Sequence, residues 1–202
     1  MRLKLKQVSL MKDETAKFNI INSILISIIF SGKNGEYTLN LKNKFNHQIL
    51  SLCAKHLSIN TDRKIIWKIE GQNFNKNTNS KTKAIIGTVM SYIKNSVLAV
   101  RKNFEKKMSL LGNEYSFKLN KNNDLILDIG FSHLLLVKKF KNIDWKIEND
   151  ILTFYGKDKM LVSQAREVVY NLKPLNPYKA KGFHKTETIM KFKERKTATK
   201  TE

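Results

Sequence analysis

The stretch YSFKLNKNNDLILDI, residues 115–129, holds the pattern that decides the fold. On either side of a polar centre, apolar and polar side chains alternate one by one. A period of two is typical of a strand with one face on a core and the other in solvent. The centre, Lys-Asn-Asn-Asp at 121–124, has the composition of a tight turn. The stretch therefore predicts a β-hairpin.

The chain after this hairpin predicts a second hairpin and then a helix. Residues 144–147 and 151–155 alternate around an Asn-Asp turn at 149–150. Asp158 stands where an N-cap is expected, because a carboxylate there accepts hydrogen bonds from the first free amides of a helix. The predicted apolar stripe of this helix consists of Leu161, Ala165, Val168 and Leu172.

The chain before residue 115 shows the same order of strands followed by a helix. We expect residues 20–30 to form a buried strand, with a turn at 32–35 into a second strand. Residues 65–69 alternate in the manner of a half-buried strand, and the polar segment 71–83 indicates a loop. Apolar side chains three or four positions apart then predict a helix over residues 84–104.

These elements predict an α+β protein of two similar small domains, each an antiparallel sheet with a helix packed on one face, plus a basic C-terminal tail. The expected boundaries are an N-terminal extension at 1–17, a first domain at 18–104, a second domain at 105–172 and the tail at 173–202. The repeated order of elements suggests an internal duplication.

Positive charge dominates the composition. The 202 residues carry a formal net charge of +21 at pH 7. Such a charge opposes compaction, so we expect a polyanionic partner, either nucleic acid or an anionic membrane surface. Lysine supplies most of the charge, which favours contacts to phosphate over the readout of base edges. The abundance of Ile, Lys and Asn, with only 2 Pro, is also typical of an AT-rich genome, organellar or bacterial.

The tail, residues 173–202, is the strongest physical signal for RNA. It contains nine Lys or Arg against three Glu. A segment with so few apolar side chains does not fold alone but becomes ordered on a polyanion. Tyr178 is suited to stack on a base or a sugar, and Gly182 allows a phosphate to approach the backbone. We therefore expect this segment to contact RNA.

No motif for a metal, a cofactor or a small-molecule substrate stands out. Cys53 is the single cysteine, and with His56 it falls short of the four ligands of a structural zinc site. Ser132 and His133 lack the Gly-x-Ser-x-Gly context of a nucleophile elbow. The run Gly-Lys-Asp-Lys at 156–159 is suited to phosphate at a helix N-terminus, although it departs from nucleotide-binding patterns.

Two alternatives stay open at this point. An RNA-processing enzyme with a basic surface would have to build its active site from His133 and three acids, Asp124, Asp128 and Asp144. A membrane-surface protein would use the apolar segment 20–30 together with the basic tail. That segment is about half as long as the ~20 residues of a membrane-spanning helix. We expect neither an enzyme nor a membrane partner.

A series of short motifs lies along residues 31–196, and the most specific is LDIGFSH at 127–133. The others are GKNGE at 32–36, IGT at 86–88, IKN at 93–95, FEKK at 104–107, LGNEY at 111–115, GKDK at 156–159 and PYKAKG at 177–182. In order and spacing this series resembles the ribosomal large-subunit protein L six family, in its bacterial and organellar form. The chain departs from the family pattern at Asn113, Glu114, Ser116, Leu134 and Ala180, and the last of these replaces a glycine.

The resemblance implies a structural protein of the large ribosomal subunit. Its second domain and tail would bind large-subunit ribosomal RNA near the sarcin–ricin loop and the translation-factor site. Its first domain would face solvent and the stalk base, with other ribosomal proteins nearby. The residues to which RNA contact is carried over are Lys106, Lys107, Ser132, His133, Lys157, Lys159, Tyr178, Lys179, Lys181 and Gly182.

The resemblance and the composition together favour a mitochondrial ribosome, with the protein encoded in the organelle and located in the matrix. The cytoplasm of an AT-rich bacterium is the alternative location.

Overall fold

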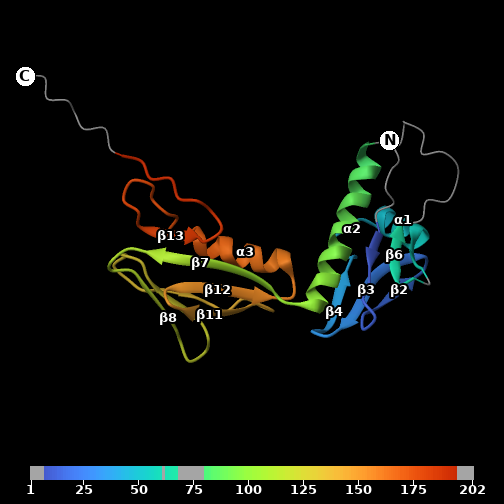
Figure 1. Ribbon diagram of the computed structural model, residues 1–202, viewed down its shortest axis with the longest axis horizontal. Helices are drawn as coiled ribbons and strands as arrows, with labels where there is room; N and C mark the ends of the chain where they lie inside the picture. Colours follow the sequence, from blue (N-terminus) through green and yellow to red (C-terminus); the bar gives the residue numbers. More distant parts are fainter. Residues whose placement is uncertain (1–6, 61, 68–79, 195–202) are drawn as a thin grey trace, which may run out of the picture. The chain divides into compact units, whose positions relative to one another are not determined.

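The computed structural model describes residues 7–60, 62–67 and 80–194, and the chain divides into two compact units, residues 1–103 and 104–202 (Figure 1). Each unit combines antiparallel sheets with helix. The α+β class, with two similar small domains, is therefore confirmed.

In its described part, the first unit contains two three-stranded sheets and two helices. The strand orders are β2-β3-β4 and β1-β6-β5. The elements are β1 (Gln7–Ser9), β2 (Thr15–Ile21), β3 (Ile24–Gly32), β4 (Gly35–Asn40), α1 (His47–His56), β5 (Leu57–Ile59), β6 (Lys64–Trp67) and α2 (Ser80–Arg101). Helix α1 packs on β3, and α2 packs on β3 and β4. Their apolar faces bury Leu25, Ile28 and Phe30 of β3 in one core with Ile93 and Val97 of α2.

The N-terminal residues differ from the extension that we expected at 1–17. Strand β1 pairs antiparallel with β6, and β2 already begins at Thr15. Val8 packs against the core, and the Arg101 guanidinium donates a hydrogen bond to the Ser9 carbonyl oxygen (3.2 Å). The partners of this segment lie far along the chain, so its own polar composition could not reveal the pairing.

The strand expected at residues 20–30 is interrupted by a turn. Asn22 and Ser23 have φ values of 49° and 61°, and they reverse the chain between β2 and β3. Asn tolerates the left-handed region better than most residues, and the turn is hidden in sequence by the β-branched residues on both sides. The expected turn at 32–35 is confirmed and joins β3 to β4.

The helices of the first unit differ from the prediction in two ways. Helix α1 was not predicted, because Leu50 and Cys53 are its only fully buried side chains and such a short apolar face gives little periodicity. Helix α2 begins at Ser80, inside the segment 71–83 that we expected to be a loop, and ends at Arg101, so that Phe104, expected at the end of this helix and of the first domain, is instead the first residue of β7 in the second unit. Residues 68–79, with most of that segment and the end of the strand expected at 65–69, lie outside the described residues.

In its described part, the second unit contains a four-stranded sheet, a three-stranded sheet and one helix. The strand orders are β11-β12-β7-β13 and β10-β9-β8. The elements are β7 (Phe104–Leu111), β8 (Ser116–Leu119), β9 (Leu125–Asp128), β10 (Leu135–Val137), β11 (Asp144–Glu148), β12 (Ile151–Gly156), α3 (Lys159–Tyr170) and β13 (Gly182–Lys185). Both predicted hairpins are confirmed, β8 with β9 and β11 with β12. Figure 1 shows α3 lying along β7, and α3 also contacts β12.

Helix α3 begins as predicted, and Leu161, Ala165 and Leu172 of the predicted stripe pack in the core of the second unit, whereas Val168 does not. The Asp158 carboxylate accepts a hydrogen bond from the Met160 amide (2.8 Å), which confirms the N-cap. The fully buried side chains are Val162, Ala165, Arg166 and Val169. Val168, from the predicted stripe, is 45% exposed. An arginine takes an inward position here because glutamates of the same unit pair with its charge, which an apolar pattern cannot indicate.

Part of the expected tail at 173–202 is folded into the second unit. Strand β13 pairs with β7 and completes the four-stranded sheet. Phe183 is fully buried in the core of this unit. The sequence did not reveal this strand, because a strand of four residues gains its stability from a partner that lies far earlier in the chain. Residues 195–202 lie outside the described residues.

Candidate nucleic-acid interface

Tyr115 lies against two glycines whose positions leave no room for a side chain. Gly112 follows β7 with a φ of +144°, and Gly130 follows β9 with a φ of +74°. A Cβ atom at Gly112 would lie 2.6 Å from Tyr115 Cδ2, and one at Gly130 would lie 2.9 Å from Tyr115 Cε1. The tyrosine ring therefore packs directly on the backbone of two separate turns and joins them.

Two lysines place their ammonium groups over aromatic rings at this point. Lys173 Nζ lies 5.7 Å from the centroid of the Tyr115 ring and 4.7 Å from that of Phe131. Lys181 Nζ lies 6.0 Å from the Tyr115 centroid. These distances suit attraction between a cation and the negative face of a ring. The side chain of His133 lies beside Phe131, and we call these five residues the tip cluster.

The predicted contact residues Ser132 and His133 are exposed in the loop between β9 and β10. The His133 ring is nearly parallel to the Phe131 ring, with an interplanar angle of 18° and centroids 6.2 Å apart. The LDIGFSH motif thus meets the tyrosine of LGNEY at Gly130, and a lysine of PYKAKG lies over the same tyrosine ring. Three motifs that are separate in sequence form one surface.

Asn176 holds the loop that carries Tyr178, Lys179 and Lys181. Its Oδ1 accepts hydrogen bonds from the amides of Tyr178 (2.9 Å) and Lys179 (3.3 Å). The backbone amide of Asn176 donates a hydrogen bond to the Lys181 carbonyl oxygen (3.0 Å). All three of the predicted contact side chains are exposed, and Tyr178 is 53% exposed. A closed loop, rather than an extended tail, presents them to solvent.

The backbone conformation and packing of this loop account for the small residues at positions 180 and 182. Ala180 has a φ of +53°, in the left-handed region where a Cβ atom costs about 1–2 kcal/mol. The alanine therefore keeps the turn that the family's glycine would favour. Gly182, with a φ of +128°, is buried, and a Cβ there would lie 2.7 Å from the Pro174 carbonyl oxygen. Close packing within the chain thus accounts for this glycine.

Lys106 and Lys107 are neighbours on β7 with different surroundings. Lys106 is half-buried, and its Nζ lies 2.7 and 2.9 Å from the two carboxylate oxygens of Glu187. This hydrogen bond, with the nearby Lys106 and Arg166 charges, holds the pKa of Glu187 below its usual value. Lys107 is exposed and forms no ion pair with any described residue. Of the two, Lys107 is the better placed to meet a phosphate.

Lys157 and Lys159 lie at the other end of the four-stranded sheet. Gly156 pairs with the first residue of β7, whereas Gly182 pairs with the last. Strand β7 has eight residues, so at about 3.4 Å per residue roughly 24 Å separates the two ends. The predicted contact residues are therefore spread along β7, with Lys106 and Lys107 between its two ends, and the tip cluster lies at the Gly182 end only.

Sequence reasoning missed three members of the tip cluster, Tyr115, Phe131 and Lys173. Tyr115 looked like the first residue of an alternating strand, and Lys173 was one lysine among many. Phe131 directly precedes two predicted contact residues, and this position could have indicated that it belongs to the same surface.

The acids nominated for an enzyme do not gather around His133. Asp124 accepts a hydrogen bond from the Lys139 amide (2.9 Å), and Asp144 pairs with Lys139 Nζ (2.5 Å). Asp128 lies at the opposite end of β9 from Asp124. Within the described ranges, no group of three or more His, Cys, Asp or Glu side chains could hold a metal ion.

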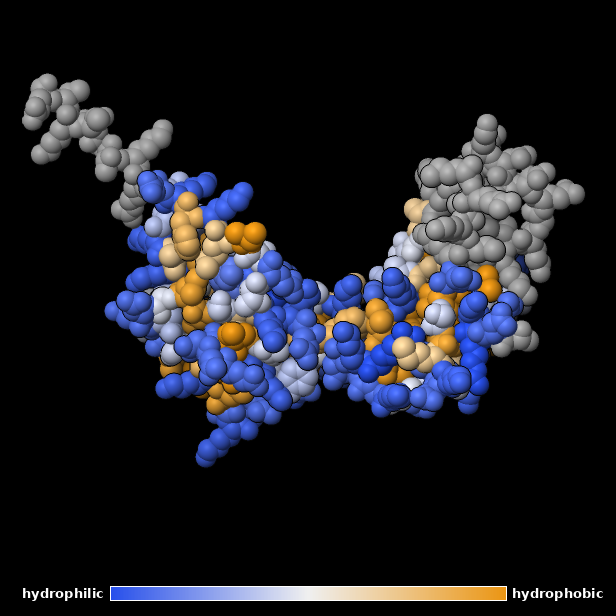
Figure 2. All heavy atoms as spheres, viewed as in Figure 1, coloured by the Kyte–Doolittle hydropathy of each residue, from blue (hydrophilic) through white to orange (hydrophobic). Residues whose placement is uncertain are grey.

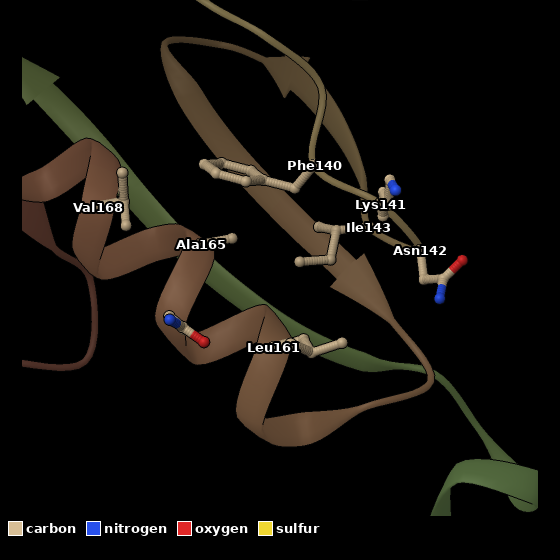
Figure 3. Close-up of a pocket in the computed structure, with 8 residues that line it drawn as sticks. Phe140, Lys141, Asn142, Ile143, Leu161, Ala165 and Val168 are labelled. Carbon is tan, nitrogen blue, oxygen red and sulfur yellow. The ribbon is translucent and has the colours of Figure 1, made fainter. Parts of the chain in front are cut away.

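A hollow of about 280 Å³ lies between α3 and the segment that precedes β11. Figure 3 shows Leu161, Ala165 and Val168 along the helix, opposite residues 140–143. The volume is slightly below the ~300–1,000 Å³ of small-molecule pockets, and the lining is mostly apolar. No cluster of reactive side chains lies in it, so the tip cluster remains the stronger candidate site.

The apolar segment 20–30 contributes to strands β2 and β3. None of the helices in the described residues combines the length and apolar character that crossing a membrane requires.

Known proteins match this chain along most of its length. It is 32% identical to the large ribosomal subunit protein uL6 of a Nitratiruptor species over 139 residues, which cover 69% of this chain and 74% of that protein. It is 31% identical to uL6c of Pyropia yezoensis over 149 residues, or 71% of this chain and 82% of that protein. The chain belongs to the uL6 family. A further relative, uL6c of Porphyra purpurea, is 32% identical over 108 residues, or 53% of this chain and 59% of that protein.

The uL6 relatives confirm the resemblance to the L six family that the short motifs indicated, although no family model matches the chain. Members of the uL6 family are structural ribosomal proteins, so the expectation that this chain is not an enzyme is also confirmed. The relatives are of bacterial and chloroplast type and do not single out a mitochondrial ribosome.

Proposed function

We propose that this chain is a structural component of a large ribosomal subunit, and that its second unit binds large-subunit ribosomal RNA near the sarcin–ricin loop and the translation-factor site. Family membership supports the first part. The observation that carries the RNA contact is the tip cluster, where Lys173 and Lys181 meet aromatic rings at an exposed end of the sheet.

The proposed mechanism is electrostatic. Lys107, Lys159, Lys179 and Lys181 are exposed and form no ion pair with a described residue. Each lysine that neutralises a phosphate releases counterions from the RNA, so affinity falls as salt rises. The folded sheet fixes where those charges lie, which suits recognition of RNA by shape.

The full-length protein and large-subunit RNA provide the first test. We expect Lys179→Gln with Lys181→Gln to weaken binding at low salt and to reduce the slope of log affinity against log salt by about two. Lys121→Gln is the matched control, because Lys121 lies in the turn at the other end of the β8–β9 hairpin. Affinity that does not change with salt would contradict the electrostatic mechanism.

The contribution of the tail needs a truncation that leaves β13 intact. A stop after Thr188 removes five Lys or Arg and two Glu but keeps β13 and the Glu187 ion pairs. We expect the shortened protein to enter the large subunit less efficiently in sucrose-gradient sedimentation. Unchanged incorporation would show that residues 189–202 do not contribute to the RNA interface. Deletion from residue 173 would be uninformative, because it also removes a strand.

The same proposal places the protein in the matrix of a mitochondrion, encoded by the organelle, on the basis of its composition rich in Ile, Lys and Asn. The first unit would face the stalk base and neighbouring ribosomal proteins. Sedimentation of the protein with the large subunit from purified mitochondria tests the location, and cross-linking of that particle identifies the neighbours. Recovery only as a free species insensitive to nuclease would contradict the proposal.

A further inference from the structure

The loop between β9 and β10 exposes an aromatic pair that the fold does not need. Residues 130–134, Gly-Phe-Ser-His-Leu, are five consecutive exposed residues. Phe131 is 44% exposed and lies outside the buried core of the second unit. A large aromatic side chain in such a loop gains little from folding, so packing does not explain its place there.

The two rings of this loop already have the orientation of a stack. Phe131 and His133 are 18° from parallel, with centroids 6.2 Å apart. Lys173 Nζ lies over the Phe131 ring, 4.7 Å from its centroid, so a positive charge stands at one face of that ring. Adjacent rings and a cation suit a nucleotide, because the base stacks on the rings while the ammonium meets the phosphate.

The loop is fixed on both sides before any ligand arrives. Ile129 is 1% exposed and Leu135 pairs with Leu127 of β9, so both ends of the loop are anchored. Gly130 packs on Tyr115 with no space for a Cβ atom. A rigid platform loses little conformational freedom on binding, which favours affinity.

We propose that Phe131 and His133 form a stacking platform for one unpaired nucleobase of the ribosomal RNA. The proposal rests on the proposed RNA-binding function and adds a contact of a different chemistry. Lysine contacts to phosphate weaken with salt, whereas stacking is insensitive to it. Every base has a π-face, so the platform accepts an unpaired base without selecting its identity.

The test compares Phe131→Ala with Leu134→Ala in the full-length protein. Leu134 is the matched control, since it lies in the same loop, is 62% exposed and carries no ring. We expect Phe131→Ala to lower affinity for large-subunit RNA by about tenfold with an unchanged salt slope. Leu134→Ala should leave affinity unchanged, and Phe131→Tyr should retain it. Ultraviolet irradiation should join the peptide containing Phe131 to a base.

Three outcomes would overturn the inference, and they separate it from the proposed function. If the wild-type protein binds with the expected salt dependence but Phe131→Ala equals Leu134→Ala and no cross-link forms, only the platform fails. If both variants bind RNA normally but enter the particle poorly, the loop contacts a protein instead. If the wild-type protein does not bind the RNA at all, the function fails and the platform with it. Circular dichroism of each variant checks that it is folded.

Discussion

Each unit attaches a helix to a distant segment through an arginine and a glutamate, but the buried member is the glutamate in the first unit and the arginine in the second. In the first unit, Arg101 Nε and Nη2 donate to the two carboxylate oxygens of Glu14, at 2.5 and 3.0 Å. Glu14 is 6% exposed. In the second unit, Arg166 lies 3.0 Å from Glu167 and 3.4 Å from Glu187, and the side chains of these glutamates are 40% and 50% exposed.

In the second unit, the ion pairs of the arginine belong to a network that includes two lysines. Lys106 shares Glu187 with Arg166, and Lys185 shares Glu167 with it, with Lys185 Nζ 2.7 Å from the carboxylate. Two glutamates therefore form ion pairs with three cations around α3 and β13. Because two glutamates pair with the buried Arg166, loss of either glutamate still leaves it one partner, whereas loss of Arg101 leaves the buried Glu14 without a counter-charge.

The comparison shows that charge alone does not identify the RNA-binding unit. Residues 1–103 contain 18 Lys or Arg against 5 Asp or Glu, a net charge of +13, and residues 104–202 contain 20 against 12, a net charge of +8. Figure 2 shows hydrophilic and apolar side chains side by side on the surface of both units. In the first unit Lys44 lies over the Tyr92 ring, whereas in the second unit two lysines, one of them exposed, meet Tyr115 and the exposed Phe131 at one place.

Breaking the buried pair should have the largest effect on stability. We expect Arg101→Ala to lower the stability of the first unit by about 3 kcal/mol, because Glu14 is left buried without its partner. Hydrogen exchange measured by mass spectrometry reports each unit separately. Lys102→Ala, an exposed neighbour, should have little effect. Equal exchange in the two variants would show that the pair contributes no more to stability than an exposed lysine without this partner.

A substitution in the second unit should have a smaller effect on stability. Ala180→Gly relieves the left-handed strain at φ +53° and should stabilise the loop before β13 by about 0.5–1 kcal/mol. Slower exchange in residues 176–185, with no change in the first unit, is the expected result. Faster exchange would mean that the greater freedom of glycine in the unfolded chain outweighs the strain.

The pH dependence of the network should give the smallest effect. Because the pKa of Glu187 is lowered in the folded state by its bond to Lys106, its contribution is present above the usual value of 4.5 and is lost as the pH falls through the lowered pKa. Glu187→Gln should therefore cost about 0.5 kcal/mol at neutral pH and nothing in acid. Glu194→Gln, at an exposed glutamate without an ion pair to a described residue, is the control. A cost that persists in acid would exclude the ionic explanation.

The features that were predicted correctly depend on residues close together in sequence. The alternation of Phe117 and Leu119, or of Leu125 and Leu127, marks each strand of the first predicted hairpin without reference to the rest of the chain. Asp158 marks the start of α3 for the same reason, since a capping side chain bonds to an amide two residues away. Local chemistry is enough for such elements.

Several of the features that were missed depend on partners that are distant in sequence. Strand β1 needs β6 and strand β13 needs β7, and one of the two glutamates that pair with the inward Arg166, Glu187, lies beyond β13. The candidate site was found in part, since His133 and Lys181 were predicted and Tyr115 and Phe131 were not. Each motif was visible alone, but the contact between motifs was not.

The amino-acid sequence by itself determined the α+β class, the hairpins of β3 with β4, β8 with β9 and β11 with β12, the family and the cationic character, because periodicity, turn chemistry, short motifs and charge are properties of neighbouring residues. Only the tertiary structure decided which cations are neutralised within the protein and which lie beside exposed rings, because that depends on distances between segments that chain folding brings together.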